Sequence, residues 1–166
     1  MSDLVTVILA AGKGTRMKSA LPKVLHKAGG KAMVAHVLAA AKAAGAARQI
    51  VVTGFGGDQV REALAGQAEF VTQTEQLGTG HAVKMTAPRL KDTQGTIMVL
   101  CGDTPLLTGA LLKKLYDEHI AAQAKATVLT AVMPDATGYG RIIRQADGSV
   151  EKIVEEVTAL SPNTRA

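Results

Sequence analysis

Aromatic residues and cysteine are scarce in this sequence. It contains no Trp, two Phe, two Tyr and a single cysteine, Cys101. One cysteine excludes an intramolecular disulfide, which favours a cytoplasmic protein. The shortage of aromatic rings removes the stacking platforms on which proteins hold single-stranded nucleic acid. Because zinc-finger and helix-turn-helix patterns are also missing, we expect no nucleic acid as a partner.

Long hydrophobic runs are missing as well. No apolar run approaches the roughly 18 residues that a membrane span requires. The N-terminus has no basic region before its short apolar run, so a signal peptide is not expected either. The chain has 166 residues, of which 47% are hydrophobic, and a mean hydropathy of +0.16. This composition predicts one globular, cytoplasmic domain with a proper core and no membrane span.

Acidic residues are missing from the first third of the chain. Between Leu4 and Gly57 there is no Asp or Glu, whereas the whole chain has a net charge of +5. A positive field concentrated in this way suits an anionic ligand. The cations of this stretch are Lys13, Arg16, Lys18, Lys23, Lys27, Lys31, Lys42 and Arg48.

An apolar run leads into a glycine-rich loop, Leu9-Ala-Ala-Gly-Lys-Gly-Thr-Arg16. This pattern is typical of a buried strand followed by a loop. Gly12 and Gly14 allow a ligand close to the backbone and permit a positive φ. Bare backbone amides beside the cations Arg16 and Lys23 suit a polyphosphate, so we expect a nucleoside-triphosphate site. The alternative is a plain glycine turn with solvated lysines.

Two other phosphate-binding loops fit this stretch less well. The dinucleotide fingerprint needs a third small residue where this chain has Met17, and an acidic residue about 20 positions further on. The P-loop needs Gly-Lys-Ser/Thr four residues after its first glycine, and residues 12–15 do not supply it.

Strand and helix patterns alternate along the chain, which predicts an α/β fold with a doubly wound, mostly parallel sheet and helices on both faces. Ligands of such sheets bind beyond the carboxyl ends of the strands, at the switch point in strand order. The predicted strands are 4–10, 49–53, 69–72, 96–100 and 127–132. The predicted helices are 31–44, 58–65, 80–90 and 109–121.

Several local signals refine these elements. Asp58 and Thr108 are candidate N-caps, and Gly45 is a candidate helix stop. On the last predicted helix, leucines 111, 112 and 115 should face inward. Asp147-Gly148 between 140–144 and 149–154 predicts a C-terminal β-hairpin. Residues 161–166 should form a frayed end.

Asp103 directly follows the fourth predicted strand, after Gly102 and before Thr104-Pro105. A carboxylate in this place can bind Mg²⁺, which prefers oxygen ligands and bridges to phosphate. It can equally be a turn residue whose side chain bonds its own backbone. The neighbouring Cys101 is either close to this crevice or a buried, inert thiol, and we expect the buried thiol.

Gln73 follows the third predicted strand and opens a polar stretch that ends at His81. Its amide offers one acceptor and two donors, enough to recognise the edge of a base. Gly78, Thr79 and Gly80 expose backbone amides, although the stretch could also be only a polar loop with a glycine-rich helix start. The sequence around His81 favours a structural role for this residue, because no carboxylate or cysteine lies near it at ligand or triad spacing.

Five motifs together resemble one known family, the bacterial GlmU family. Its members are bifunctional N-acetylglucosamine-1-phosphate uridyltransferases and glucosamine-1-phosphate acetyltransferases, and the likeness is to the uridylyltransferase domain, from Val7 to about Glu156. The motifs are Leu-Ala-Ala-Gly-x-Gly-Thr-Arg-Met (9–17), Leu-Pro-Lys-Val-Leu-His (21–26), Gln-Leu-Gly-Thr-Gly-His-Ala (76–82), Gly-Asp-Thr-Pro-Leu (102–106) and Thr-Gly-Tyr-Gly-Arg-Ile (137–142).

The resemblance implies a Rossmann-like fold of the nucleotide-diphospho-sugar transferase type. It also implies uridylyl transfer from UTP to N-acetylglucosamine-1-phosphate with Mg²⁺, giving UDP-N-acetylglucosamine for the cell wall. Arg16, Lys23 and Asp103 would be catalytic, with Asp103 as the metal ligand. The implied substrate-binding residues are Leu9, Ala10, Ala11, Gly12, Lys23, Gln73, Gly78, Thr79, Cys101, Gly102, Asp103, Gly140 and Glu155.

Within this set, the backbone of Ala11 and Gly12 would meet the uracil together with Gln73 and residues 78–79. Gly140 and Glu155 would hold the N-acetylglucosamine. Relatives often carry Tyr where this chain has Cys101.

The resemblance also implies a fragment of a longer enzyme. The family's next sugar-contacting segment, its second metal ligand and its acetyltransferase β-helix would all lie beyond Ala166. We therefore expect turnover at least about 10²-fold below that of an extended chain, and self-association at an unpaired sheet edge. Two alternatives remain open: a module that only binds UTP or a UDP-sugar, and a related transferase with another sugar or base.

Overall fold

The computed structural model describes residues 3–14 and 17–154. The chain divides into two compact units, residues 1–124 and 125–166. No helix among the described residues is long and apolar enough to cross a membrane. The prediction of a single domain over the whole chain stays a prediction, and the expected frayed end at 161–166 lies outside the described residues.

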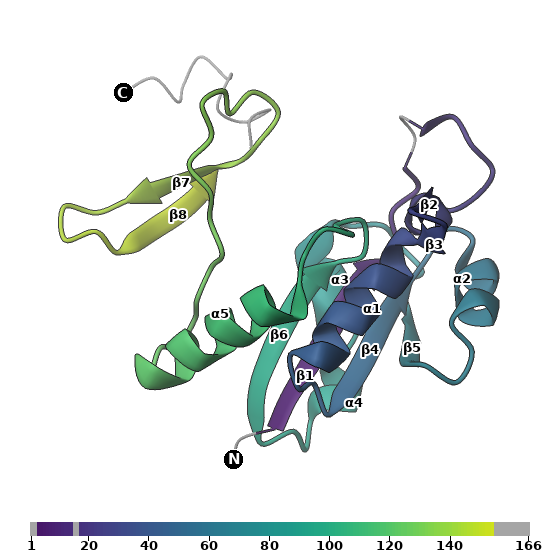
Figure 1. Ribbon diagram of the computed structural model, residues 1–166, viewed down its shortest axis with the longest axis horizontal. Helices are drawn as coiled ribbons and strands as arrows, with labels where there is room; N and C mark the ends of the chain where they lie inside the picture. The colour runs from purple at the N-terminus through teal and green to yellow at the C-terminus, as the bar shows by residue number, and fades with distance from the viewer. Residues whose placement is uncertain (1–2, 15–16, 155–166) are drawn as a thin grey trace. The chain divides into compact units, whose positions relative to one another are not determined.

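A parallel sheet forms the centre of the first unit (Figure 1). In its described part, the strand order is β5-β4-β1-β6, and every neighbouring pair is parallel. The predicted parallel sheet is thus confirmed. The strands are β1 (Asp3–Ala10), β4 (Arg48–Thr53), β5 (Glu69–Thr72) and β6 (Gly95–Cys101), each within a residue of its prediction.

The strand order places a switch point at β1. From β1 the chain moves to β4 and β5 on one side, and then returns to β6 on the other side. The pairing register aligns the carboxyl ends, because Ala10 lies opposite Thr53 and Leu9 lies opposite Cys101. The loops that follow β1, β5 and β6 therefore leave the sheet at one edge, where a ligand is expected.

Helices cover both faces of the sheet because side chains alternate along each strand. On one face, Leu4, Ile8 and Ala10 share a core with helices α1, α2 and α5. On the other face, Val7 and Val52 pack against α3 and α4. The helices are α1 (Met33–Ala43), α2 (Gly57–Ala63), α3 (Thr79–Lys84), α4 (Ala87–Leu90) and α5 (Gly109–Ala121).

Three helix predictions need correction. The predicted helix 80–90 is two short helices, α3 and α4, because Pro88 has no N–H for the helical ladder and the Thr86 hydroxyl bonds the Val83 carbonyl instead. The N-cap of α2 is Gly56, in the left-handed region at φ 61°, and not Asp58. The predicted helix 31–44 begins only at Met33, because β3 (Lys31–Ala32) pairs with β2 (Lys27–Ala28).

Two predicted helix ends are confirmed. The Thr108 hydroxyl accepts the Leu111 N–H at 3.2 Å and caps α5. Gly45, at φ 93°, ends α1, where the Gly45 and Ala46 N–H groups bond the Lys42 and Ala41 carbonyls.

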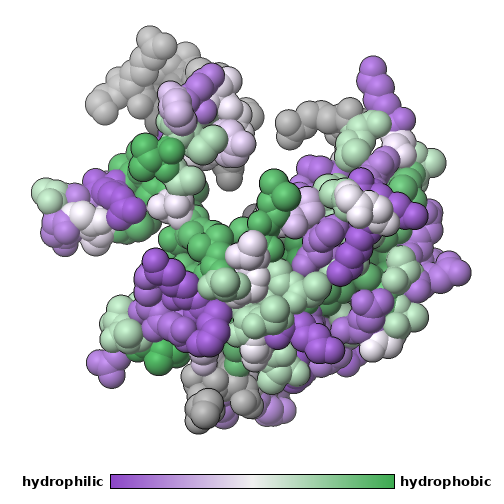
Figure 2. All heavy atoms as spheres, in the orientation of Figure 1, coloured by the Kyte–Doolittle hydropathy of each residue, from purple (hydrophilic) through white to green (hydrophobic). Residues whose placement is uncertain are grey.

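The outer face of α5 is hydrophilic (Figure 2). It carries two ion pairs, Lys113–Asp117 and Lys114–Glu118, each of which joins residues one helical turn apart. Leu112 is buried at 1% exposure, but Leu111 is 38% exposed, so the prediction that Leu111 faces inward is wrong. Neighbouring residues of a helix point in different directions, and the apolar pattern of the sequence did not show which of Leu111 and Leu112 faces the core.

The contact between α1 and α5 depends on Gly109. A Cβ at this position would lie 2.5 Å from the Ala43 Cβ and 3.0 Å from the Ala40 carbonyl oxygen. We expect Gly109→Ala to lower the free energy of unfolding by about 1–3 kcal/mol, as overpacking does. Urea denaturation followed by circular dichroism measures this change.

Gly80→Ala is the matched control, because a Cβ there meets nothing within 4 Å. Its free energy of unfolding should be unchanged or slightly raised. If Gly109→Ala unfolds at the same urea concentration as this control, the two helices are not in the contact described here.

The described part of the second unit contains a β-hairpin. β7 (Arg141–Arg144) pairs with β8 (Val150–Val154) in antiparallel fashion, and Gly148 has φ 84° in the turn, so the predicted C-terminal hairpin is confirmed. The prediction of a strand at 127–132 is wrong. Residues 127–132 are irregular in the structure, and the side chains of Val128, Leu129 and Val132 are exposed rather than packed on a core, as a stable strand requires.

Candidate active site

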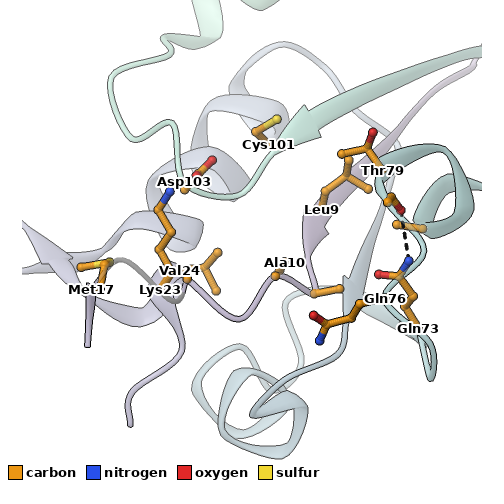
Figure 3. A pocket seen from close by; sticks show the side chains of 15 residues that line it. Leu9, Ala10, Met17, Lys23, Val24, Gln73, Gln76, Thr79, Cys101 and Asp103 are labelled. Carbon is orange, nitrogen blue, oxygen red and sulfur yellow. Dashed lines mark hydrogen bonds and ion pairs between the residues drawn. The ribbon is translucent and has the colours of Figure 1, made fainter. Parts of the chain in front are cut away.

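A pocket of about 630 Å³ opens where β1, β5 and β6 end (Figure 3). It lies in the first unit and takes residues from three separate loops. The predicted site residues that line it are Leu9, Ala10, Ala11, Gly12, Lys23, Gln73, Gly78, Thr79, Cys101 and Asp103. The remaining lining residues are Gly14, Met17, Val24, Gln76 and Ala82.

Sequence reasoning expected Gly14 to let a ligand approach the backbone, but it assigned no role to the other four of these residues. Met17 and Gln76 belong to the quoted motifs, which is the signal that could have identified them. Val24 and Ala82 also belong to quoted motifs, but they are buried apolar residues, which the sequence alone does not distinguish from ordinary core.

Four predicted site residues are not placed at this pocket, Gly102 among them. Arg16 and Glu155 lie outside the described residues. Gly140 belongs to the second unit, beside Arg141, whose guanidinium donates to the Ala136 and Tyr139 carbonyls.

The glycines around the pocket have distinct roles. Gly14 takes φ 59°, and a Cβ there would lie 2.7 Å from the Lys23 Cβ, so only glycine lets the loop pass this side chain. The expected positive φ is not found at Gly12, which has open space around it. Gly102 does not line the pocket; its N–H donates to the Leu9 carbonyl at 2.9 Å and holds the end of β6 against β1.

Lys23 and Asp103 form an ion pair at the pocket wall. The Lys23 Nζ lies 2.6 Å from the Asp103 Oδ2, and the two side chains are 41% and 32% exposed. Lys23 begins the short helix η2 (Lys23–Leu25), which the buried side chains of Val24 and Leu25 anchor to the core. An ion pair this exposed is worth only about 0–1 kcal/mol, so a ligand can separate its partners at little cost.

The turn after β6 is closed by Thr104, whose hydroxyl donates to the Cys101 carbonyl at 2.7 Å. The Asp103 carboxylate instead reaches across to Lys23. Of the described residues, no three His, Cys, Asp or Glu side chains form a metal cluster. A single carboxylate fits a divalent cation that takes its other ligands from water and phosphate, as Mg²⁺ commonly does.

Gln73 lies at the other end of the pocket and is only 5% exposed. Its Nε2 is 3.1 Å from the Gly78 carbonyl oxygen and 3.0 Å from the His81 Nδ1. Its backbone N–H donates to the Thr53 carbonyl at 2.7 Å, which fixes the start of the side chain at the end of the sheet. In Figure 3 a dashed line marks the hydrogen bond that the amide nitrogen of Gln73 makes to the Gly78 carbonyl, and the amide oxygen lies on the side of Gln76 and Ala10.

Cys101 is exposed, so the expectation of a buried thiol is wrong. Among the described residues β6 is an edge strand, and its residues Ile97, Val99 and Cys101 point away from the core that Met98 and Leu100 enter. Partial burial of the sulfur in the pocket is the main cause that raises the pKa of the Cys101 thiol. The Asp103 carboxylate raises this pKa further, whereas Lys23 lowers it.

A second cleft lies between the ends of β4 and β5 and the start of α2, and Arg61 lines it. The Arg61 guanidinium donates to the Thr53 hydroxyl at 3.2 Å and to the Thr72 hydroxyl, and it lies 5.4 Å from the centre of the Phe70 ring. Arg61 is held by these three contacts together, whereas Lys23 in the first pocket meets Asp103 in an exposed ion pair that a ligand can separate, so the first pocket is the better candidate for an anionic ligand.

Comparison with known proteins identifies the family of this chain. The family of MobA-like NTP transferase domains matches residues 6–144. The chain is similar to the bifunctional protein GlmU of Lactococcus lactis subsp. lactis, with 54% identity over 153 residues, which are 92% of this chain and 33% of that protein. The corresponding protein of Heliobacterium modesticaldum is 54% identical over 159 residues, 96% of this chain and 35% of that protein. The chain thus spans about a third of the length of these relatives.

Solved structures share the fold at low sequence identity. A UDP-glucose pyrophosphorylase from Acinetobacter baumannii has a TM-score of 0.75 at 20% identity, covering 93% of this chain and 68% of that one. A Mycobacterium tuberculosis H37Rv protein in complex with manganese has a TM-score of 0.61 at 24% identity, covering 72% of this chain and 61% of that one. At these identities the likeness establishes the fold alone.

Proposed function

Because the chain belongs to the family of MobA-like NTP transferase domains, we propose that its pocket transfers a uridylyl group from UTP to N-acetylglucosamine-1-phosphate. The products are UDP-N-acetylglucosamine and pyrophosphate. The observation that carries this proposal is the arrangement of the pocket, with a buried amide at one end and an exposed lysine–carboxylate pair at the other. The identity of 54% to the GlmU proteins supports this choice of substrates.

Base recognition is assigned to Gln73 and the neighbouring backbone. Uracil presents one N–H between two carbonyl oxygens. The Gln73 Oε1 is the acceptor proposed for that N–H, since its Nε2 already faces Gly78 and His81. Backbone N–H groups of Ala11, Gly12 and residues 78–79 are the donors proposed for the two carbonyl oxygens.

The phosphates are assigned to Lys23 and Arg16, and a divalent cation, proposed to be Mg²⁺, to Asp103. Such a cation supplies neutralisation of the charge that develops on the phosphates. The chemistry is an in-line displacement. A phosphate oxygen of the sugar-1-phosphate forms a bond to the α-phosphorus, the bond from that phosphorus to the β-bridging oxygen breaks, and its electrons leave with pyrophosphate.

No general base is required, because the attacking phosphate oxygen is already anionic at neutral pH. The catalytic contribution of the protein is therefore to position the reactants and to neutralise charge. Lys23 donates to phosphate oxygens once it leaves Asp103. Gly140 and Glu155 remain the residues proposed to hold the N-acetylglucosamine.

A pyrophosphate-release assay tests the proposal. We expect release from UTP with N-acetylglucosamine-1-phosphate and Mg²⁺, and its loss when EDTA removes the metal. The specificity for base and sugar is measured by replacing UTP with ATP, CTP, GTP or dTTP, and by replacing the acceptor with glucose-1-phosphate. A UTP titration on the same protein distinguishes an enzyme from a module that binds UTP without turning it over. Faster release with another nucleotide or sugar would replace the proposed substrates.

Cys101 reports on whether the nucleotide enters this pocket. We expect UTP with Mg²⁺ to slow labelling of Cys101 by N-ethylmaleimide, because the thiol lies in the pocket wall. The labelling rate should keep rising with pH beyond the range of an ordinary thiol, because the thiolate reacts and its pKa is raised. Mass spectrometry measures both effects. Equal rates with and without UTP would place the nucleotide elsewhere.

A further inference from the structure

The orientation of the Gln73 amide follows from its neighbours. The Gly78 carbonyl oxygen can only accept a hydrogen bond, so the group 3.1 Å from it has to be the amide nitrogen. The second hydrogen of that nitrogen points to the His81 Nδ1 at 3.0 Å. This ring nitrogen must therefore carry a lone pair, and the proton of the neutral imidazole must be on Nε2.

From this contact we propose that His81 is a positioning residue that sets which base the pocket accepts. By accepting the second amide hydrogen, His81 keeps the Gln73 oxygen turned toward the base. That oxygen selects a base edge that donates a ring N–H, as uracil and thymine do. It disfavours cytosine, whose corresponding ring nitrogen is an acceptor. The inference rests on the proposed function, since it requires a pyrimidine nucleotide beside Gln73.

The two acceptors that the Gln73 amide contacts differ, because one of them, the Gly78 carbonyl, also has a second donor. The Gly78 carbonyl also accepts the Ala82 N–H at 3.2 Å, the first hydrogen bond of α3. His81 is held in place by the same helix, because Ala82 is buried against Val7 and Val52 and the His81 carbonyl accepts the Met85 N–H at 3.1 Å. The backbone that carries the His81 ring is thus anchored to the core.

A rotation of the Gln73 amide by 180° shows what His81 prevents. The rotated oxygen would lose the hydrogen bond to the Gly78 carbonyl, which can only accept, and it would meet a donor at His81 only if the imidazole moved its proton from Nε2 to Nδ1. The rotated NH₂ would face the base and would suit the ring acceptor of cytosine. Without the acceptor at position 81, one of the two interactions that oppose this rotation is gone, and discrimination between UTP and CTP should weaken.

Two substitutions at one position separate this role from a merely structural one. His81→Leu keeps side-chain bulk and removes the acceptor, whereas the Asn oxygen of His81→Asn can take the place of Nδ1. Lys84→Leu is the matched control, since this exposed residue lies on the same helix and does not line the pocket. The measurement is the dissociation constant of UTP and of CTP, each with Mg²⁺, by calorimetry.

We expect the ratio of UTP to CTP affinity to fall by roughly three- to tenfold in His81→Leu, the effect of one neutral hydrogen bond. The ratio should recover in His81→Asn and stay unchanged in Lys84→Leu. Equal losses of UTP and CTP affinity in His81→Leu would make His81 merely structural and overturn the inference. If the unchanged chain binds UTP no better than CTP, the proposed function itself fails.

The unsubstituted chain provides a test that does not depend on how the variants fold. Nitrogen-15 NMR of the imidazole distinguishes the two neutral tautomers. We expect His81 to carry its proton on Nε2. A proton on Nδ1 would mean that this nitrogen cannot accept from Gln73, and would overturn the inference whatever the nucleotide affinities are.

Discussion

Replacing Asp103 with Asn is expected to lower metal-dependent pyrophosphate release by at least about 10²-fold, a loss of roughly 2.7 kcal/mol in transition-state stabilisation. Asn retains an oxygen and the shape of the side chain but loses the formal charge that draws the cation to the phosphates. The fold should survive, because the Lys23–Asp103 pair that the change breaks is exposed and contributes little to stability. Initial rates at saturating UTP and equal Mg²⁺ give the comparison.

Asp117→Asn is the control for this change. Asp117 is also an exposed aspartate in an ion pair with lysine, but it lies on α5 and does not line the pocket. Its turnover should match that of the unchanged chain. If Asp103→Asn also keeps turnover close to that of the unchanged chain, Asp103 is a turn residue and does not act as the metal ligand.

Replacing Gln73 with Leu is the change expected to affect UTP binding most strongly. Leu fills the space of the amide but leaves the uracil N–H and His81 without their partner, and it removes one of the two hydrogen bonds to the Gly78 carbonyl. An unsatisfied buried group costs about 1–3 kcal/mol, so UTP affinity should fall by roughly one to two decades. Calorimetric titration with UTP and Mg²⁺ measures the loss.

Gln76→Leu provides the comparison within the same pocket. Gln76 also lines the pocket, but it is exposed, and water can replace what its amide loses. We expect a change of less than about threefold. A larger loss from Gln76→Leu than from Gln73→Leu would move base recognition to the Gln76 side of the pocket.

The sequence predicts the sheet and the meeting of the loops because both follow from local patterns. Runs of β-branched residues mark β1, β4, β5 and β6, and parallel strands bring the residues that follow them to one edge. This places Ala11, Gln73 and Asp103 in one crevice before any coordinates are known. Pro88 was visible too, and its missing N–H could have predicted the break between α3 and α4.

The contacts inside the pocket could not be predicted in the same way. The Lys23–Asp103 pair depends on how η2 returns to the end of β6, which follows from the packing of Val24 and Leu25 rather than from spacing. The Gln73–His81 contact depends on Gly78 at φ 94°, a conformation that glycine permits but that the sequence alone does not specify. The exposure of Cys101 depends on the place of β6 in the sheet, whereas free cysteine is usually buried.

The most direct test of the central claim, that this pocket holds a uridine nucleotide and a divalent cation, is a crystal structure of the chain grown with UTP and Mn²⁺. Anomalous scattering locates the manganese without reference to any assumed position. We predict a manganese peak at the Asp103 carboxylate, Lys23 turned from Asp103 to the phosphates, and the uracil against Gln73. A nucleotide bound in the cleft beside Arg61, or a manganese peak distant from Asp103, would contradict the account.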